Sequence, residues 1–346
     1  MSTIQPALQA PDALANPFAG SATTGHGIWR TGVAAAVAWA AFGLLTWRWP
    51  NHVIGFSDWA FTTELGIAAL LVGAVLLVLA LAALLAGPLR TAQETLRPAG
   101  PWLIVLPLAL GAWEVLTAKT GFLPTPFFAP PQALIEVVTD DWPRLGGSVA
   151  NTLKLLGLGY FLGALTGFLV GVSIGWSRAV GYWVHPVLRL IGPLPPTALL
   201  PLTFYFFPSS YSAAVFLIAL ATGFPVAVLT WSGVAGVSKR YYDVARTLGA
   251  SNAFLVLRVA IPAALPQVFV GLFMGLGASF TVLVVAEMMG VKSGLGWYLT
   301  WAQGWASYVN MYAALIVMAL LFSGIITLLF KVRDRALVWQ KGTLKW

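Results

Sequence analysis

The sequence predicts an all-α integral membrane protein, and its composition and two long uncharged runs are the reasons. Hydrophobic residues make up 59% of the 346 positions and charged residues only 9%, whereas soluble domains carry roughly 25% charged residues. Leu65–Gly87 and Gln267–Ala286 contain no charged side chain. Each exceeds the roughly 18 apolar residues that mark a membrane-spanning helix. Lipid is therefore the solvent that most of this chain meets.

The apolar segments predict eight transmembrane helices. In order, they cover residues 31–47, 65–87, 102–118, 149–175, 183–207, 211–235, 267–289 and 311–331. The third contains Pro107 and Glu114, and the fifth contains five prolines. Proline removes a backbone hydrogen bond that neighbouring helices must replace in a membrane, so kinked or broken helices are expected at these two spans.

The chain divides into three predicted parts. Residues 1–30 are rich in small and polar residues and indicate a flexible cytoplasmic tail. Residues 31–98 hold two N-terminal helices and a linker. No small-residue cleavage site follows the first helix, so it is expected to stay in the membrane. Residues 99–346 hold six spans and one long cytoplasmic loop, 238–266. The sequence contains no convincing internal repeat, so it does not indicate the inverted-repeat architecture of many secondary transporters.

Basic residues predict the orientation. With both termini inside, thirteen Lys and Arg residues fall on the cytoplasmic side, from Arg30 to the C-terminal tail, and four fall in the outer loops. Lys154 and Arg189 are assigned near span ends and are not counted. Because cytoplasmic loops carry the excess of positive charge, both termini are expected in the cytoplasm. This placement also accounts for the net charge of +8 without nucleic-acid binding.

Several kinds of chemistry are excluded. The chain has no cysteine, so disulfides, thiolate metal sites and cysteine nucleophiles are absent. The three histidines, His26, His52 and His185, have no metal-ligand spacing. Val291-Lys292-Ser293-Gly294 lacks the glycines of a phosphate-binding loop. No catalytic, metal or cofactor site is therefore expected, and the chain is not expected to hydrolyse ATP alone.

The loop 238–266 contains a predicted corner. Ser238 can cap a short helix that runs to Leu248, and Gly249 supplies the left-handed residue that ends it. Ser251 or Asn252 then begins a second short helix. Pro262 and Pro266 are expected to break this second helix before the next span. Small side chains at the bend leave room for another protein to approach.

This loop resembles the EAA loop of ABC-importer permeases, which reads Glu-Ala-Ala, three residues, Gly, nine residues, then Ile-x-Leu-Pro. The matching positions are Asp243, Val244, Ala245, Gly249, Val259, Ile261 and Pro262, accompanied by Arg246 and Ala250. Within that family, the chain looks most like permeases of the nitrate/sulfonate/taurine group. Further landmarks are Phe122–Pro126, Asn151–Leu153, Pro193–Leu202, Ala286-Glu287 and Ser293–Gly296.

The resemblance implies a transport subunit of the bacterial inner membrane without an ATPase site of its own. Residues 99–346 would then be the six-helix permease domain, and the two N-terminal helices an addition. Implied partners are a cytoplasmic ABC ATPase dimer that uses ATP and Mg²⁺, a second permease copy, an extracytoplasmic solute-binding protein and membrane lipid. The implied solute is a small anion such as nitrate, a sulfonate, taurine or bicarbonate, with an aromatic or heterocyclic compound as the alternative.

Two patterns indicate roles inside the membrane. Glycine recurs at every fourth residue in one span, at Gly159, Gly163, Gly167, Gly171 and Gly175. This stripe favours close static helix packing over a sliding surface. Glu287, near the outer end of its span, is a candidate pathway residue, and Glu114 is a weaker one. Trp297, Trp301 and Trp305 indicate an interfacial aromatic belt, with a rim for a delivery protein as the alternative.

Two other classes of protein remain alternatives at this point. A secondary transporter or channel would place coupling charges within the membrane, and a membrane enzyme would need converging polar side chains there. Neither class explains the corner at 238–266.

Overall fold

The computed structural model describes residues 28–52, 59–81 and 88–340. Its regular structure in these ranges is entirely helical. Most of the predicted tail, the end of the predicted second span, and Lys341 and Lys345 lie outside the described residues. The chain forms two compact units: residues 1–50 with 62–115, and residues 51–61 with 116–346. The boundary between units thus falls later in the chain than the predicted boundary at 98–99.

The first unit is built around three long helices. Its helices are α1 (Arg30–Arg48), α2 (Thr62–Leu81), α3 (Pro88–Leu96) and α4 (Gly100–Glu114). Small residues let α1 and α2 approach closely, because a Cβ at Gly66 would lie 3.3 Å from the carbonyl oxygen of Gly43. Helix α4 runs parallel to α1, with Gly111 against Phe42. A buried hydrogen bond of 2.8 Å from Thr46 Oγ1 to Glu114 Oε2 also joins them.

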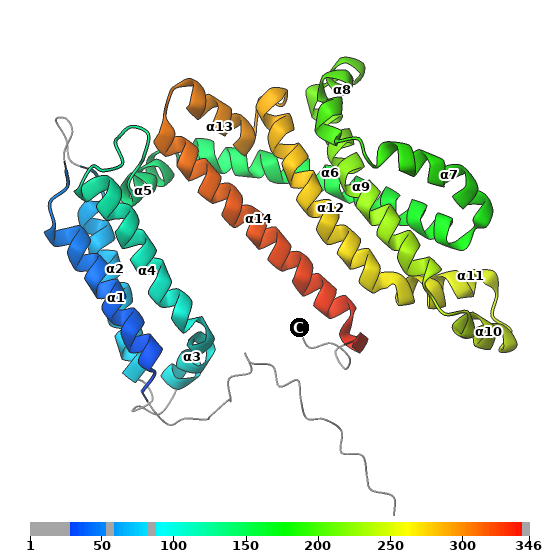
Figure 1. The fold of residues 1–346 in the computed structure, drawn as a ribbon, viewed down its shortest axis with the longest axis horizontal. Coiled ribbons are helices and arrows are strands. Elements are labelled where there is room, and N and C mark those ends of the chain that lie inside the picture. Colours follow the sequence, from blue (N-terminus) through cyan, green and yellow to red (C-terminus); the bar gives the residue numbers. More distant parts are fainter. Residues whose placement is uncertain (1–27, 53–58, 82–87, 341–346) are drawn as a thin grey trace, which may run out of the picture. The chain divides into compact units, whose positions relative to one another are not determined.

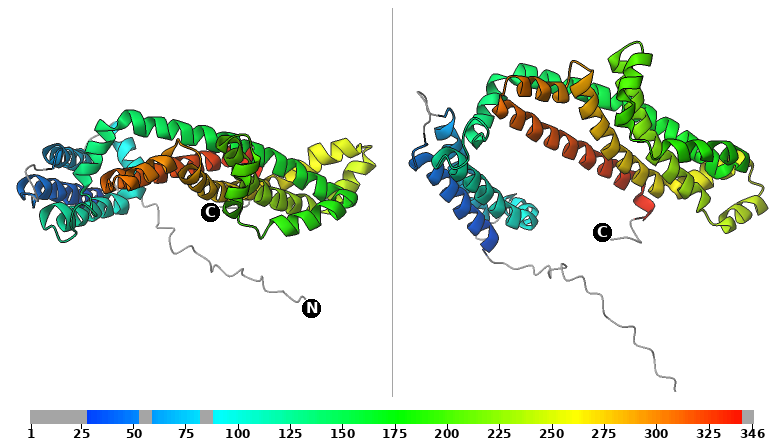
Figure 2. Two further views of the ribbon diagram at one scale, coloured as in Figure 1. Left: turned by 90° about the horizontal axis from the view of Figure 1, so that it is seen from above. Right: turned by 45° about the horizontal axis from the view of Figure 1, so that its top comes forward.

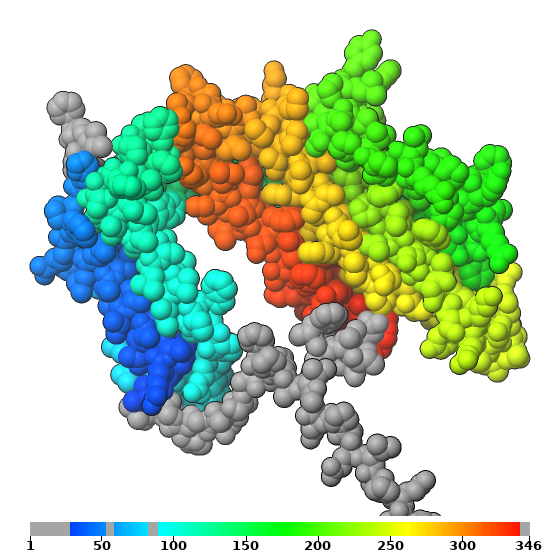
Figure 3. Space-filling model, viewed as in Figure 1, coloured from blue at the N-terminus to red at the C-terminus, as the bar shows by residue number. Residues whose placement is uncertain are grey.

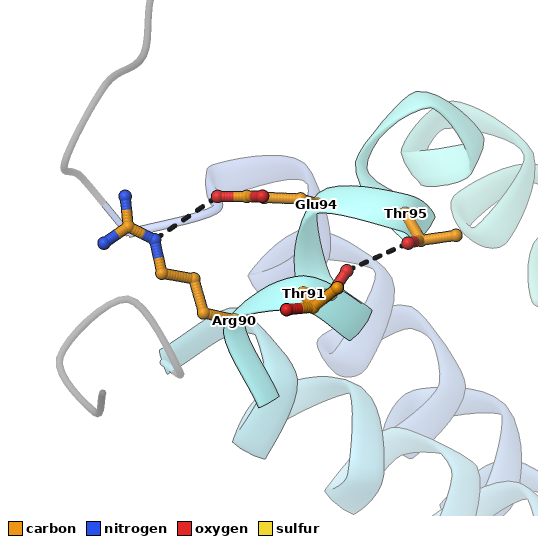
Figure 4. Close-up of polar contacts among 4 residues, drawn as sticks. All are labelled: Arg90, Thr91, Glu94 and Thr95. Atoms are coloured by element: carbon orange, nitrogen blue, oxygen red, sulfur yellow. Dashed lines mark hydrogen bonds and ion pairs between the residues drawn. The ribbon is translucent and has the colours of Figure 1, made fainter. Parts of the chain in front are cut away.

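Helix α3 differs from its neighbours because it is polar and short. Arg90 and Glu94 form an exposed ion pair of 3.3 Å one turn apart, and Thr95 donates a hydrogen bond to the carbonyl of Thr91 (Figure 4). Exposed pairs at this spacing stabilise a helix by only about 0.3–0.5 kcal/mol. Helix α3 is therefore suited to an aqueous or interfacial position rather than to the hydrocarbon.

The second unit contains the remaining helices (Figures 1 and 2). They are α5 (Pro131–Asp140), α6 (Trp142–Trp176), α7 (Arg178–Ile191), α8 (Leu200–Phe206), α9 (Ser210–Ala235), α10 (Lys239–Thr247), α11 (Asn252–Phe254), α12 (Ile261–Met289), α13 (Leu295–Gly304) and α14 (Tyr308–Ala336). Its core lies where α6, α9 and α12 meet, around Leu155, Ile218 and Leu283. Tyr160 on α6 donates to the carbonyl of Leu272 on α12 at 2.9 Å.

Helices α6 and α9 run parallel along the glycine stripe. Gly159 lies against Ile218, and Gly175, sixteen residues later, lies against Val234. Both sets of contacts advance in the same direction along the chain, so the two helices point the same way. Helix α12 packs on α9 in the opposite direction, because Gly275 meets Thr222 while Ala264 meets Gly233.

The parallel packing decides how α7 and α8 connect these helices. The chain leaves α6 at Trp176 and must return to the other end before α9 begins at Ser210. Helices α7 and α8 make this return, with a bend of 84° between Ile191 and Pro196. The pair is therefore a broken span rather than a re-entrant loop. The proline-rich fifth span is broken as predicted.

Among the described residues, six helices are long and apolar enough to cross a membrane, and the α7–α8 pair makes seven if it counts as one span. The six cover Thr62–Leu81, Leu89–Lys119, Trp142–Trp176, Ser210–Ala235, Asn252–Met289 and Tyr308–Ala336. The predicted first span is helical, as α1, but it is not one of these six. The predicted count of eight therefore stays a prediction.

The prediction that Pro262 and Pro266 break the helix after the corner is wrong. The helix runs continuously from Asn252 to Met289. A π-helical segment, Leu255–Ala260, comes directly before α12. The wider π turn displaces the carbonyl groups that the ring of Pro262 would otherwise meet, so the helix continues past the proline.

Candidate functional site

The α10–α11 corner (residues 238–266) is the site that the sequence singles out, and Gly249 is its turning point. Gly249 has a φ of +83°, the left-handed conformation that glycine adopts without strain. The amide of Gly249 donates to the carbonyl of Arg246, and the amide of Ala250 donates to the carbonyl of Ala245. This pair of hydrogen bonds is the Schellman motif that ends a helix.

The two serines at the corner differ in what they do. Ser251 accepts a hydrogen bond from the amide of Phe254 at 3.3 Å and so caps the second helix. Ser238 precedes α10, but its side chain makes no capping hydrogen bond. The predicted cap at Ser238 is thus absent. Helix α10 is instead held by an aromatic contact with α6. Tyr242 packs edge-on against Trp176 at the end of α6, with 5.8 Å between ring centroids.

One face of the exposed helix α10 carries apolar side chains. Tyr241, Val244 and Leu248, the last of which directly follows α10, lie three and four residues apart and are 65%, 61% and 83% exposed. This spacing places them on one face of the helix. Asp243 and Arg246 are exposed beside this face. Figure 3 shows the corner at the end of its unit, where another protein can reach it.

The structure places the other predicted corner residues where α11 joins α12. Val259 lies within the π-helical segment Leu255–Ala260 and is half-buried, whereas Ile261 and Pro262 begin α12. A cluster of Val234, Ala260 and Ala264 lies buried beneath them. The corner therefore stands on a packed base formed by α9 and α12.

The glycine stripe of α6 faces α9 throughout. A Cβ at Gly167 would lie 3.0 Å from Cα of Gly223 and 3.0 Å from Cβ of Val226. At Gly159 and Gly175, it would lie 2.7 Å from Ile218 Cβ and Val234 Cβ. Real Cβ atoms do not approach this closely, so no larger side chain fits without moving the helices. Gly163 and Gly171 meet Thr222 and Thr230 in the same way.

Glu287 lies at the opposite end of α12 and is 1% exposed. Its carboxylate accepts hydrogen bonds from Thr152 Oγ1 and from the amide of Gly296, both at 2.7 Å. Thr152 also accepts from the amide of Leu295 at 2.8 Å. The first two residues of α13 thus donate to α6 and α12. Gly294, with a φ of +100°, leaves space for the carboxylate in front of them.

A second polar contact holds the other side of α13. Tyr298 donates a hydrogen bond of 2.7 Å to Asp141 Oδ2, which also lies 3.6 Å from Arg144. Burial, together with this hydrogen bond to Asp141, raises the pKa of Tyr298. The Arg144 guanidinium lies 4.3 Å from the ring of Trp301. Helix α13 is therefore fixed to the start of α6 as well as to α12.

The three predicted belt tryptophans occupy different surroundings. Trp297 and Trp301 pack against the buried cluster of Leu145, Leu295 and Tyr298. Trp305 is 75% exposed. The sequence did not single out Thr152 or Tyr298 as partners of this region. Thr152 was visible only as part of the landmark Asn151–Leu153.

Glu114 belongs to the first unit and is fully buried. Its carboxylate accepts from Thr46, as described above, so it links α4 to α1. Among the described residues, no group of three or more His, Cys, Asp or Glu side chains could hold a metal ion.

These features define a multi-pass helical membrane protein with an exposed, apolar corner at one end and a fixed short helix at the other. The family model described as "Binding-protein-dependent transport system inner membrane component" matches residues 160–337. The chain belongs to this family. It is the membrane-spanning permease subunit of an ABC importer in the inner membrane.

Two relatives show the extent of the similarity. The chain is 33% identical over 252 residues to the taurine transport system permease protein of Escherichia coli, covering 69% of this chain and 89% of the relative. It is 28% identical over 264 residues to the nitrate import permease protein of Synechococcus elongatus, covering 70% and 89%. Membership of this family favours an importer that works with an ATPase and a binding protein over a secondary transporter or channel.

Proposed function

We propose that this permease imports a small anion: nitrate, a sulfonate, taurine or a chemically similar solute. The names of the nitrate and taurine relatives support this solute class. The chain makes the path through the membrane, and a separate ATPase drives alternating access to it. ATP and Mg²⁺ are held by that ATPase, while this chain binds no cofactor and has no ATPase site.

The observation that carries the proposal is the exposed apolar face of the α10–α11 corner. An exposed row of Tyr241, Val244 and Leu248 would be costly in water unless a partner covered it. Asp243, Val244, Ala245, Arg246, Gly249, Ala250, Val259, Ile261 and Pro262 form the proposed ATPase-coupling loop. A groove on the ATPase receives α10, and the bend at Gly249 sets the angle at which it enters.

The permease is proposed to have eight crossings: two N-terminal helices followed by the six-helix domain of residues 99–346. Helix α1 supports this count because it packs along α2 and runs parallel to α4, as a third crossing in that unit would. Both termini, residues 1–30 among them, and the α10–α11 corner then lie in the cytoplasm, and α13 lies at the outer face. Lipid covers the outward apolar surfaces of the spans.

A second copy of the chain completes the pathway, so that two corners meet two ATPase subunits. Within each copy, Gly159, Gly163, Gly167, Gly171 and Gly175 serve static packing of α6 on α9. An extracytoplasmic binding protein delivers the solute at the α13 end. Glu287 remains a candidate pathway residue, although its buried hydrogen bonds support a role in holding α13.

Affinity purification of the tagged chain from its native membrane, followed by mass spectrometry, tests the proposal. An ABC ATPase should be recovered in about equal molar amount to the permease, and a secreted solute-binding protein should be recovered after cross-linking. Recovery of the chain without an ATPase would refute the proposal.

A further inference from the structure

Helix α7 places a cation against the long helices of this unit. It begins at Arg178, directly after α6 ends. Arg189, eleven residues further on, lines a cavity with Val228 and Trp231 of α9. These two residues lie beside Gly171 and Gly175, in the last turns of α6, so Arg189 lies one to two turns from the end that carries the α10–α11 corner. Ionisable residues within a membrane domain are costly, and many serve a solute pathway.

A cavity of about 440 Å³ adjoins this residue. Helix α7 and the bend contribute His185, Leu188, Arg189, Gly192 and Pro193 to its lining, and α9 contributes Phe224, Val228 and Trp231. A second cavity of about 310 Å³, between α6, α7 and α9, shares Leu188 and Phe224 with the first. The lining of this second cavity is almost wholly apolar. Together, the two cavities can hold a small organic ion with an apolar body.

The first cavity is lined by one cation, Arg189, and by no carboxylate. Arg189 is exposed in this chain, and its guanidinium forms no ion pair or hydrogen bond with any described residue. His185 packs edge-on against Trp231, with ring centroids 4.3 Å apart, so the imidazole is held at the cavity wall. Both side chains offer N–H donors, and no carboxylate lines the cavity.

No described carboxylate of this chain lines the cavity beside Arg189. The described acidic residues of this unit lie in the outer loops (Glu136, Asp140 and Asp141), on α12 (Glu287), on α10 (Asp243) and at the end of α14 (Asp334). None of them is among the residues that line the cavity, so an anion from outside the protein can supply the opposite charge.

We infer that Arg189, with His185 and Trp231, forms an oxyanion-binding subsite of the translocation pathway at the broken helix. The guanidinium presents a planar set of N–H donors that matches the oxygens of nitrate, sulfonate or carboxylate groups. Leu188, Phe224 and Val228 receive the rest of the solute. The inference rests on the proposed import of an anion, and it assigns that anion a binding residue. Discontinuous helices at mid-membrane serve solute binding in other transporters.

Thiol labelling tests the subsite directly, because the chain contains no cysteine. Val228→Cys places a single thiol in the cavity wall. The purified permease in nanodiscs is treated with an anionic reagent, 2-sulfonatoethyl methanethiosulfonate, or with its trimethylammonium counterpart. Trp305→Cys, outside the cavity and 75% exposed at the native tryptophan, is the control. The ratio of the labelling rate with the anionic reagent to that with the cationic reagent should be at least fivefold higher at Val228→Cys than at the control.

The preference must depend on Arg189 and on small anions. Adding Arg189→Gln should lower the ratio of rates to that of the control, and nitrate or methanesulfonate should slow labelling while glycerol phosphate should not. Arg189→Lys keeps the charge, so it should keep the preference for the anionic reagent, while nitrate or methanesulfonate should slow labelling less. This variant provides the test if Arg189→Gln does not accumulate. Equal rates, no effect of either substitution, an unreactive thiol, or protection by glycerol phosphate alone would overturn the inference.

Failure of the subsite is distinguishable from failure of the proposed function. The labelling uses the permease alone, whereas recovery of an ATPase from the native membrane reports on the importer. A permease that retains its ATPase but labels without preference keeps the proposed function and loses the subsite.

Discussion

The hydroxyl of Thr152 on α6 donates a hydrogen bond of 2.7 Å to the carboxylate of Glu287 on α12. The same hydroxyl accepts from the first amide of α13, and the same carboxylate accepts from the second. A short helix at one end of the membrane domain is thus tied to each of two long helices by one hydrogen bond, and the third hydrogen bond joins the two long helices to each other. Because α13 lies at the proposed outer face, this arrangement bears on how the pathway closes there.

Glu287→Ala is expected to loosen α13. It leaves the hydroxyl of Thr152 and the amide of Gly296 without their buried acceptor, which costs about 1–3 kcal/mol of stability. Thermal unfolding in detergent should show a lower Tm, and hydrogen exchange should rise in residues 294–304. Asp140→Ala, which removes an exposed carboxylate, should change neither.

The alternative role of Glu287 in the pathway gives a different result. In that case, Glu287→Gln would reduce solute transport while Tm and hydrogen exchange in α13 stayed at their original values. A double-mutant cycle with Thr152→Val separates the two roles, since coupling in stability supports the structural role.

Gly167→Leu is expected to force α6 and α9 apart. A Cβ there already lies 3.0 Å from Cα of Gly223, and overpacking of this kind costs about 1–3 kcal/mol or more. The yield of assembled permease and its Tm should both fall. Gly157→Leu is the matched control on the same helix, because a Cβ at Gly157 meets nothing within 4 Å. Equal yields for the two variants would show that the stripe has no packing role.

Gly249→Val is expected to uncouple the permease from its ATPase. A Cβ at Gly249 meets no atom of this chain within 4 Å, but a side chain at a φ of +83° is strained, by about 1–2 kcal/mol. The variant should reach the membrane at near-normal levels and fail to retain the ATPase or to stimulate ATP turnover. Asp243→Lys should have a milder effect, because it reverses a charge without disturbing the turn.

Gly249→Asn separates strain from obstruction at the corner. Asparagine tolerates the left-handed conformation, so this variant keeps the turn and adds only bulk. Loss of ATPase with both Asn and Val would show that the partner needs the empty space. Retention with Asn alone would assign the effect to the backbone, and full activity of Gly249→Val would remove the corner as the coupling element.

Reporter fusions test the orientation. A reporter active only in the cytoplasm should work when fused at Trp346 or within residues 90–97, and should fail near Asp140 or Lys292. A fusion after Asn51, between α1 and α2, should also fail if α1 crosses the membrane. An active fusion at Asp140 with a silent one at Trp346 would reverse the topology, whereas an active fusion at Asn51 alone would remove α1 from the crossings.

The features that could be predicted are those that depend on residues close together in the sequence. The left-handed turn at Gly249 follows from residues within one helical turn of it, and the glycine stripe follows from a spacing of four. The hydrogen bond between Thr152 and Glu287 joins residues 135 positions apart. No periodicity relates such residues, so the anchoring of α13 was not visible before the fold was known.

The surroundings of Arg189 were missed for a local reason. The sequence placed the start of its span at residue 183, which left Arg189 near one end. Helix α7 instead begins at Arg178, after Ser177 accepts a hydrogen bond from the amide of Val180. This shift of five residues moves Arg189 about 7.5 Å further along its helix at 1.5 Å per residue, where it faces Val228 and Trp231 of α9 across a cavity. The continuity of the helix past Pro262 was missed similarly, because a π turn is not readable from composition.

The broken α7–α8 crossing also constrains how this protein is inserted into the bilayer during synthesis. A lone spanning helix needs about 20 apolar residues, and α7 and α8 have 14 and 7. Arg189 makes the first of them still less suited to enter lipid unaided. Neither half is long enough to span lipid by itself, so we expect the segment to enter the bilayer only after α9 has emerged and can pack beside α6. Insertion of residues 142–235 is then expected to be cooperative.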